Sequence, residues 1–374
     1  MIKKILLLIV CAIVSWGAMN AEIVTINGVI YDAFTGTGQA AVKGCETGIK
    51  NLVIPAQITY NGKIFSVTSI TGNGFAYNTE LETATIDGSG FSVTSSSFKG
   101  CANLKKVTLL EGVHYMGAQC FEKCVSLEEI TMTNSVKTLG YGAFSGCVSL
   151  KSLTLSNSIT KIEEYAFNEC KALTHINLPP NLETIGQMAF NGCSSLRKVS
   201  LPTTLKKLDH NTFSKSGLRY IYIPEGITEM GFAFAGCKEL KVVSLPSTLT
   251  RFQGFYSCSG ITDVECRSTT PVKPTDDFER DVYQHAQLYV PKGCVTAYKR
   301  SGVWGNFIGI TDDYSPFPLT DTNGDKVTDV ADVNRTIDSI LKLNNQTHHK
   351  DDVNRDGIID ITDLNEIINE ILGL

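Results

Sequence analysis

Two short acidic segments near the end of the 374-residue chain carry the residue types best suited to chemistry. One runs from Asp321 to Asp332 and the other from Asp352 to Asp363, and both place oxygen-bearing side chains at loop positions 1, 3, 5, 9 and 12. Calcium takes about six to eight oxygen ligands, and a loop with this spacing, whose position 7 adds a backbone carbonyl, wraps them around one ion. The sequence therefore predicts two Ca2+ sites, with the ligands Asp321, Asn323, Asp325, Val327, Asp329, Asp332, Asp352, Asn354, Asp356, Ile358, Asp360 and Asp363.

Each acidic loop is followed by an apolar pattern of helical spacing, and the two patterns coincide after a shift of 31 residues. Pro316 and Pro318 stand just before the first loop, so no helix enters it and each unit is half an EF-hand. This duplicated half EF-hand, over residues 319–374, resembles the type I dockerin. The resemblance implies a small all-α domain with two calcium loops that binds a cohesin-like module on a partner protein.

The dockerin resemblance also assigns partner recognition to loop positions 10 and 11, which are Val330, Ala331, Ile361 and Thr362. Because the two pairs differ, the two-fold dual binding mode of symmetric dockerins is not expected. Position 6 is Gly357 in the second loop but Lys326 in the first, where the sharp turn favours glycine. We therefore expect the first site to bind calcium more weakly.

Most of the cysteines occupy one repeated position, at Cys101, Cys124, Cys147, Cys170, Cys193, Cys237 and Cys258, and Ser216 takes that position once. The serine indicates that small size matters there more than sulfur chemistry, so we predict a buried packing column of reduced thiols. Bridges between Cys120 and Cys124, or among Cys45, Cys266 and Cys294, remain alternatives. A zinc site is not expected, because no CxxC pair or nearby histidine cluster accompanies these cysteines.

The sequence offers little for catalysis. Its six histidines are scattered, and it lacks the common fingerprints for serine hydrolases, zinc proteases, phosphate loops and dinucleotide binding. A glycosidase needs two carboxylates in one cleft, whereas the predicted strand faces offer single ones such as Glu129, Asp263 and Glu265. We therefore predict that the protein is not an enzyme.

An internal repeat sets the elements that position these residues. Phenylalanine recurs every 23 residues at Phe75, Phe98, Phe121, Phe144, Phe167, Phe190 and Phe213, then at spacings of 21 at Phe234 and Phe255. A leucine usually follows six residues later, and next comes an alternating apolar pair such as Val107 and Leu109 or Val199 and Leu201. Alternation of this kind predicts a short strand with one buried face. One 23-residue unit cannot bury that face alone, so the repeat predicts a solenoid of parallel strands around a phenylalanine core.

The pattern F-x-x-C-x-x-L-x-x-[VIL]-x-L-P, over residues 65–266, resembles the BspA-type (Treponema-type) leucine-rich repeat. Residues 58–70 and 288–310 are similar to the opening and closing segments of that family. The resemblance implies a mainly β solenoid and an extracellular surface protein, often an adhesive one.

The start of the chain is typical of a secretory signal peptide. Lys3 and Lys4 precede an apolar run from Ile5 to Trp16, and cleavage is expected after Ala21, with Ala18 as the alternative. The predicted organisation is then a signal peptide (1–21), an N-terminal β cap (22–64), a repeat solenoid with its C-terminal cap (65–310), a linker (311–318) and the dockerin-like domain (319–374).

Charge and hydropathy narrow the class of partner. The net charge is −5, so no electrostatic attraction to nucleic acid or to an anionic membrane is expected. No later apolar run is long enough to span a bilayer. We therefore predict a secreted or cell-surface, non-catalytic adhesion protein. Its repeat face would bind an extracellular or host protein, with the aromatic pair Tyr220 and Tyr222 as anchors. The alternative is a carbohydrate-binding accessory subunit of a polysaccharide-degrading assembly, with the same tyrosines as a stacking platform.

Overall fold

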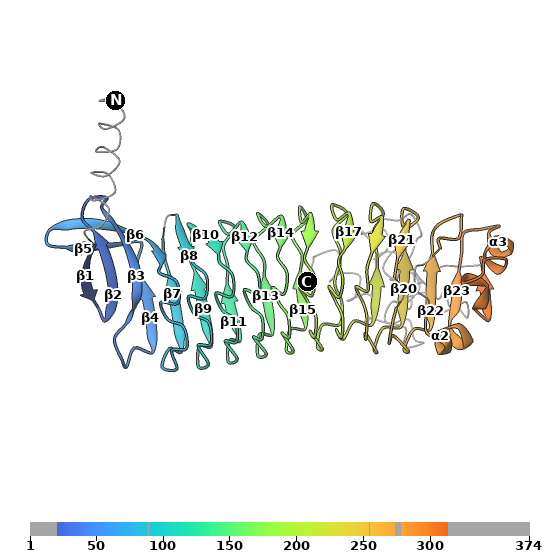
Figure 1. Cartoon of the computed structure of the whole chain (residues 1–374), viewed down its shortest axis with the longest axis horizontal. Helices are drawn as coiled ribbons and strands as arrows, with labels where there is room; N and C mark the ends of the chain where they lie inside the picture. The colour runs from blue at the N-terminus through green and yellow to red at the C-terminus, as the bar shows by residue number, and fades with distance from the viewer. Residues whose placement is uncertain (1–20, 89, 254, 274–277, 313–374) are drawn as a thin grey trace, which may run out of the picture. The chain divides into compact units, whose positions relative to one another are not determined.

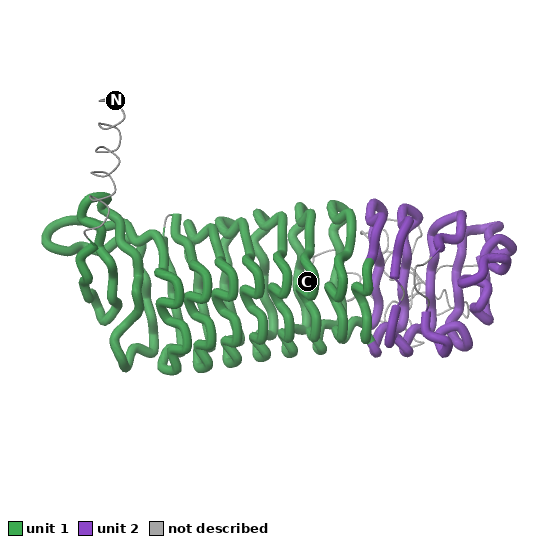
Figure 2. The backbone as a smooth tube through the Cα atoms, viewed as in Figure 1, with its two compact units in different colours: residues 1–218, 231–237 green, residues 219–230, 238–374 purple. Residues whose placement is uncertain are grey.

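The computed structural model describes residues 21–88, 90–253, 255–273 and 278–312. The chain divides into two compact units, unit 1 comprising Met1–Leu218 and Gly231–Cys237 and unit 2 comprising Arg219–Met230 and Lys238–Leu374 (Figure 2). Residues 1–20 of the predicted signal peptide and the whole predicted calcium domain lie outside the described residues. The predicted calcium ligands and the four predicted cohesin contacts therefore lie outside them too.

Unit 1 begins with a block of mainly antiparallel strands. Two of its hairpins turn through the pairs Asn27-Gly28 and Asn61-Gly62, and all four residues have φ between 49° and 76°. Positive φ at both central residues is the type I′ turn, for which Asn-Gly is favoured because its twist matches that of the strands. The strands are β1 (Ala21–Ile26), β2 (Val29–Phe34), β3 (Gln39–Cys45), β5 (Gln57–Tyr60) and β6 (Lys63–Ile70). Since β3 pairs antiparallel with β2 and parallel with β6, it joins this block to the parallel coil that follows.

The parallel coil of unit 1 has two short strands in most turns (Figure 1). The first strands are β4 (Asn51–Ile54), β7 (Thr83–Ile86), β9 (Lys106–Leu109), β11 (Glu129–Thr131), β13 (Ser152–Thr154) and β15 (His175–Asn177). The second strands are β8 (Phe91–Val93), β10 (Val113–Met116), β12 (Thr138–Leu139), β14 (Lys161–Ile162), β16 (Thr184–Ile185) and β17 (Lys207–Leu208). Lys106 lies opposite Glu129, and Ser152 opposite His175, which is the 23-residue register that the repeat predicts. The predicted parallel solenoid is confirmed.

One predicted strand is wrong. Residues 196–202 form no strand, although Val199 and Leu201 each remain only 7% exposed. The apolar pair is therefore buried as the repeat predicts, but the backbone there does not enter a ladder.

The repeated phenylalanines form the core of unit 1. Eight rings, Phe75, Phe98, Phe121, Phe144, Phe167, Phe190, Phe213 and Phe234, stack in sequence with centroid separations of 5.0 to 5.7 Å and interplanar angles of 3° to 11°. Each of these side chains is at most 2% exposed. The stack follows from the parallel register, because strands about 4.8 Å apart bring equivalent side chains into columns.

The third side of unit 1 consists of tandem turns. We call it the turn face; in each repeat it runs from three residues before the column phenylalanine to two residues after it. Two positions there have left-handed backbone, and glycine, which adopts positive φ without steric cost, fills only some of them. The position two residues before the ring holds Asn73, Ser96, Gln119, Gly142, Tyr165, Met188 and Asn211, and the position two residues after it holds Tyr77, Gly100, Lys123, Gly146, Glu169, Gly192, Lys215 and Gly236.

Replacing Lys123 with glycine should raise the free energy of unfolding by about 1 kcal/mol, because a left-handed backbone costs a residue with a Cβ about 1–2 kcal/mol. Lys123 has a φ of 58° and its side chain is exposed, so little packing is lost. Urea unfolding followed by circular dichroism measures the change. Lys123→Ala is the matched control, since it removes the side chain but keeps the strain; equal stability of the two variants would contradict the explanation.

The column cysteines of unit 1 form a hydrogen-bonded ladder. Each thiol donates to the carbonyl of the phenylalanine in the preceding turn, over Sγ–O distances of 3.0 to 3.2 Å, in the pairs Cys101 to Phe75, Cys124 to Phe98, Cys147 to Phe121, Cys170 to Phe144, Cys193 to Phe167 and Cys237 to Phe213. The first five of these cysteines are buried free thiols, so the predicted reduced packing column is confirmed. The residues considered for bridges, Cys45, Cys120, Cys266 and Cys294, are free thiols as well.

The described residues of unit 2 form a five-stranded parallel sheet, a short strand pair and three short helices. The sheet holds β18 (Tyr220–Tyr222), β20 (Val242–Leu245), β22 (Asp263–Cys266), β23 (Gln287–Tyr289) and β24 (Gly309–Thr311), and β19 (Glu229–Met230) pairs with β21 (Arg251–Phe252). The helices are α2 (Arg280–His285), α3 (Val295–Lys299) and the 3-10 helix η1 (Trp304–Asn306). Tyr298 and Trp304 are fully buried here and donate to the carbonyls of Ser268 and Val272, at 2.8 and 2.6 Å. These bonds fix the helical segment to the chain that follows β22, so the sheet ends in a closed aromatic core.

Candidate recognition surface

The outward side chains of four strands in unit 1 form the surface that the repeat predicts for binding. We call it the strand face; it consists of Lys106, Thr108, Glu129, Thr131, Ser152, Thr154, His175 and Asn177. These positions alternate with buried residues such as Val107 and Ile130, and all but Thr108 are exposed. Because the inward residues pack on a rigid core, the strand face presents hydroxyl, amide and charged groups at fixed positions, one strand after another.

The charges on and beside the strand face largely compensate one another. Lys106 lies 3.0 Å from Glu129, and both side chains are about half exposed. At the neighbouring edge, the Lys105 and Lys50 ammonium groups, both hydrogen-bonded to Glu82, lower the pKa of that carboxyl. Exposed pairs like these add little stability. They do leave the surface nearly neutral, which suits a partner recognised by hydrogen bonds rather than a polyanion.

The predicted anchors Tyr220 and Tyr222 lie on β18 in unit 2. Tyr222 is 40% exposed, and the Arg267 guanidinium carbon lies 4.1 Å from its ring centroid. A cation over a ring face at this distance is an attractive cation–π contact. One face of Tyr222 is therefore covered by this chain's own arginine.

Arg267 also joins three successive strands of unit 2. Its Nε donates to the Leu245 carbonyl at 3.2 Å and its Nη2 donates to the Ile223 carbonyl, at the ends of β20 and β18. Its Nε also lies 3.5 Å from the Glu225 carboxylate. Burial opposes ionisation of Glu225, but donors from Ser247 and the Arg267 charge outweigh it, and the pKa is lowered. No periodic pattern in the sequence marks this arginine, because its role depends on strand ends rather than on strand faces.

Loss of the Arg267 contacts should destabilise unit 2. Arg267→Ala removes the ring contact and donors to two carbonyls, and we expect the free energy of unfolding to fall by about 2 kcal/mol. Arg267→Lys should recover little, since an ammonium cannot reproduce the planar fork of donors. Hydrogen exchange of the backbone amides of Ile223 and Leu245 localises the effect. Unchanged exchange there in Arg267→Ala would contradict this role of Arg267.

Outward positions of the repeat strands are not all exposed in unit 2, although the alternating pattern predicts that they are. Val242 and Ser244 occupy outward positions on β20 but are 4% and 0% exposed. Ser244 donates to the Glu265 carboxylate at 2.5 Å, and Tyr289 donates to Asp263 at 2.9 Å. Here the outward side chains bond across neighbouring strands, so their polar groups are satisfied while buried. Asp263 and Glu265 share the outward face of β22 and are not the isolated carboxylates that the sequence suggests.

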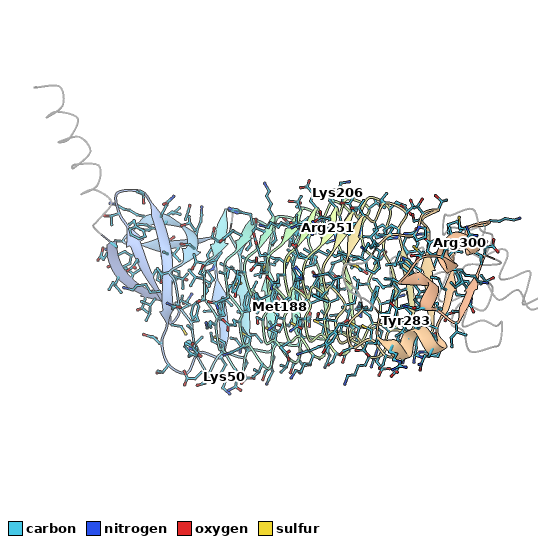
Figure 3. All side chains as sticks on the ribbon, turned by 45° about the vertical axis from the view of Figure 1, so that its right-hand side comes forward. Lys50, Met188, Lys206, Arg251, Tyr283 and Arg300 are labelled. Carbon is cyan, nitrogen blue, oxygen red and sulfur yellow. The ribbon has the colours of Figure 1, made fainter. Side chains whose placement is uncertain are left out.

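A surface hollow of about 410 Å3 lies beside α2 and η1 in unit 2. Phe278 and Tyr283 line it together with the polar side chains of Arg280, Gln284 and Asn306. Figure 3 shows Tyr283 in this region of unit 2. The Tyr283 hydroxyl accepts a hydrogen bond from the Phe278 amide at 3.2 Å, so this wall of the hollow is held by the local fold.

The described residues hold no group of three or more His, Cys, Asp or Glu side chains placed to bind a metal ion. Among the helices of residues 21–312 that the structure describes, none is long and apolar enough to cross a membrane.

Comparisons with known proteins agree with the repeat architecture. The sequence profile described as the BspA type leucine rich repeat region matches residues 68–184 and 160–280, in six copies. No curated protein matches significantly.

Similar solved structures include three bacterial leucine-rich repeat proteins. One from Bacteroides ovatus ATCC 8483 is 22% identical, with 73% of this chain and 80% of that chain covered and a TM-score of 0.40. One from Eubacterium ventriosum ATCC 27560 is 16% identical, with 72% and 78% covered and a TM-score of 0.39. A leucine rich cell surface protein from Faecalibacterium prausnitzii A2-165 is 20% identical, with 66% and 94% covered and a TM-score of 0.32.

Proposed function

Because this chain belongs to the family of BspA-type leucine-rich repeat proteins, we propose that it is a secreted or cell-surface adhesion protein without catalytic activity. Repeat proteins of this kind bind through extended surfaces, which their stacked units hold rigid. The observation that carries the proposal is the strand face of unit 1, a regular exposed polar surface on a core of stacked rings. Its partner would be an extracellular or host protein.

Binding of purified extracellular matrix proteins to the immobilised full chain, measured by surface plasmon resonance, tests this function. The double variant Thr131→Arg with Thr154→Arg places bulky charges on two exposed positions of the strand face and should abolish binding. Tyr256→Arg is the control, because Tyr256 is 62% exposed and lies outside the strand face. Binding that survives the double variant would remove the strand face as the recognition surface.

A calcium-dependent tail would tether this surface to a second protein. The support is the pair of twelve-residue loops at 321–332 and 352–363, in which five oxygen-bearing side chains recur at equal spacing. When bound, calcium would order the loops by neutralising ligands that otherwise repel one another. The partner would be a cohesin-like module.

Calorimetric titration of the metal-stripped full chain with Ca2+ tests the tail. Two sites are expected, with the first weaker because Lys326 stands where the second loop has Gly357. Asp321→Ala should then remove the weaker site and Asp352→Ala the tighter one. Two indistinguishable sites would refute the asymmetry, and no heat at all would refute the calcium module.

Glycan recognition by Tyr220 and Tyr222 is the alternative, and the geometry favours it less. A sugar ring stacks on an open aromatic face, whereas Arg267 already covers one face of Tyr222. The Tyr222→Ala variant on an array of neutral glycans tests this alternative, because the alternative requires that variant to lose glycan binding.

A further inference from the structure

A row of rings and one thioether runs along the turn face of unit 1, away from the strand face. It consists of Tyr141, Tyr165, Met188, His210 and Phe232, one from each of five successive repeats, and we call it the aromatic strip. Tyr141 is 45% exposed, and the other four side chains are partly or fully exposed. The ring centroids of Tyr141 and Tyr165 lie 5.3 Å apart and those of His210 and Phe232 lie 6.1 Å apart. Figure 3 shows Met188 midway between the edges of unit 1 that Lys50 and Lys206 mark.

The backbone under the aromatic strip is strained. Tyr165 and Met188 have φ of 59° and 56°, a conformation in which bulky residues are rare. The equivalent residue one turn earlier is Gly142, which adopts its φ of 58° without that cost. Neither side chain is fully buried, so core packing does not require either of them. The same left-handed position holds Asn73, Ser96, Gln119 and Asn211 in other turns, so the conformation belongs to the repeat, and the bulk of the side chains is what distinguishes the turns of Tyr165 and Met188.

A row of neutral hydrogen-bonding groups runs beside the aromatic strip. Asn191 donates to Asn168 at 2.8 Å, and Asn168 donates to Ser145 at 3.3 Å, each from one turn to the next. Tight turns join this row to the strip, because the backbone N–H groups of Asn168 and Asn191 donate to the backbone carbonyls of Tyr165 and Met188. Amide and hydroxyl groups thus stand next to rings in several consecutive turns.

Two of the acidic groups next to the aromatic strip are paired, whereas Glu164, which precedes Tyr165, is exposed. Glu163 lies 2.8 Å from Lys161, and Asp209 lies 2.9 Å from Lys207. The aromatic strip itself holds no carboxylate or ammonium group, and it stands beside neutral amides. This chemistry fits an uncharged ligand that has both apolar C–H faces and many hydroxyl groups.

We propose that the aromatic strip binds a neutral polysaccharide chain lying parallel to the stack of turns. Contacts of the same kind recur once per turn, at a rise of about 4.8 Å. A polymer of pyranose units presents one apolar ring face and its hydroxyls at a similar repeat, so successive sugars can meet successive turns. The side chains on one face of an extended peptide are spaced about 6.6 Å apart, so they fall out of register with the turns of the protein within a few repeats.

The tilt of the rings limits the form of the glycan. The two pairs have interplanar angles of 47° and 42°, so the strip is ridged rather than flat. A single soluble chain can follow such a surface, whereas the flat face of a crystalline polysaccharide cannot. The proposal thus concerns a site and a ligand class separate from those of the strand face.

Affinity electrophoresis of the full chain tests the proposal, with gels containing hydroxyethylcellulose, barley β-glucan, glucomannan or dextran, and crystalline cellulose in a separate pull-down. Retardation by at least one soluble glycan and no capture by crystalline cellulose are expected. Tyr165→Gly should weaken that binding about tenfold, as expected for the loss of one stacked ring. It should also relieve the left-handed strain, so the variant remains folded and its lost binding is not an unfolding effect.

Tyr115→Ala is the matched control, because Tyr115 is 39% exposed on β10 and outside the strip, and its binding should be unchanged. Lack of retardation by every glycan in the panel overturns the proposal, as does full retention of binding in folded Tyr165→Gly. Binding of matrix proteins that depends on Tyr165 while no glycan binds would reassign the strip to protein recognition and overturn it equally. Loss of the strand-face interaction alone leaves these results unaffected, so failure of the two sites can be told apart.

Discussion

Replacing Phe144 with alanine should lower the free energy of unfolding by about 4 kcal/mol. A buried phenylalanine cut back to alanine costs about 3–5 kcal/mol, through lost transfer energy and the cavity that remains. Phe144 is fully buried and stacks on a ring at 5.6 Å on one side and at 5.4 Å on the other, so two aromatic contacts disappear with it. Urea unfolding followed by circular dichroism measures the loss.

The same measurement on Tyr115→Ala provides the control. That ring is partly exposed and outside the column, so its removal should cost about 1 kcal/mol or less. Hydrogen exchange should show the loss concentrated in the turns next to Phe144, because each repeat contacts mainly its neighbours. Comparable costs for the two variants would mean that the ring column is not the main source of stability.

The stability of unit 1 should fall steeply as the pH rises from about 9 to about 12. Burial raises the pKa of the Cys147 thiol from 9.0 to about 12, and burial raises the pKa of Cys124 and Cys170 well above 9.0. Below pH 9 both the folded and the unfolded chain keep these protons, so the contribution is fully present. Above pH 9 the unfolded chain releases them and the folded chain does not, which costs about 1.4 kcal/mol per pH unit for each thiol.

Unfolding of the reduced protein in urea at pH 8.0, 9.5 and 10.5 measures this slope. The matched control is the triple variant Cys124→Ser, Cys147→Ser and Cys170→Ser, because the chain itself places Ser216 at the same repeat position. Serine does not titrate in this range, so the slope should decrease by about 4 kcal/mol per pH unit. An unchanged slope would show that other groups, such as Tyr31, whose pKa burial raises to about 12, control alkaline unfolding.

The sequence was sufficient for the core because inward residues repeat at one spacing. Phe144 and Cys147 recur in neighbouring units, and a parallel stack turns such recurrence into columns. The same periodicity distinguishes inward from outward positions, which is why the exposure of Thr131 and Thr154 could be predicted. Spacing does not reveal whether an outward group meets a partner across the sheet, so the burial of Ser244 against Glu265 was missed.

The candidate sites were harder to predict, for the same reason. Arg267 acts on strand ends, and the aromatic strip lies on turns, where no apolar alternation marks the residues. The only signal for the strip was the occurrence of Tyr165 and Met188 at the position where an earlier repeat has Gly142. Its meaning depends on knowing that the backbone there is left-handed.

The spacing of 21 residues between Phe213 and Phe234 has a consequence for how this surface could diversify. Their rings still stack at 5.7 Å and 7°, although the chain between them is two residues shorter than between the earlier rings. The core therefore tolerates deletions in a repeat as long as the phenylalanine of that repeat still stacks on its neighbours. Insertions and deletions can then change the surface of one repeat at a time. Binding preference could thus change during evolution while the stacked core stays the same.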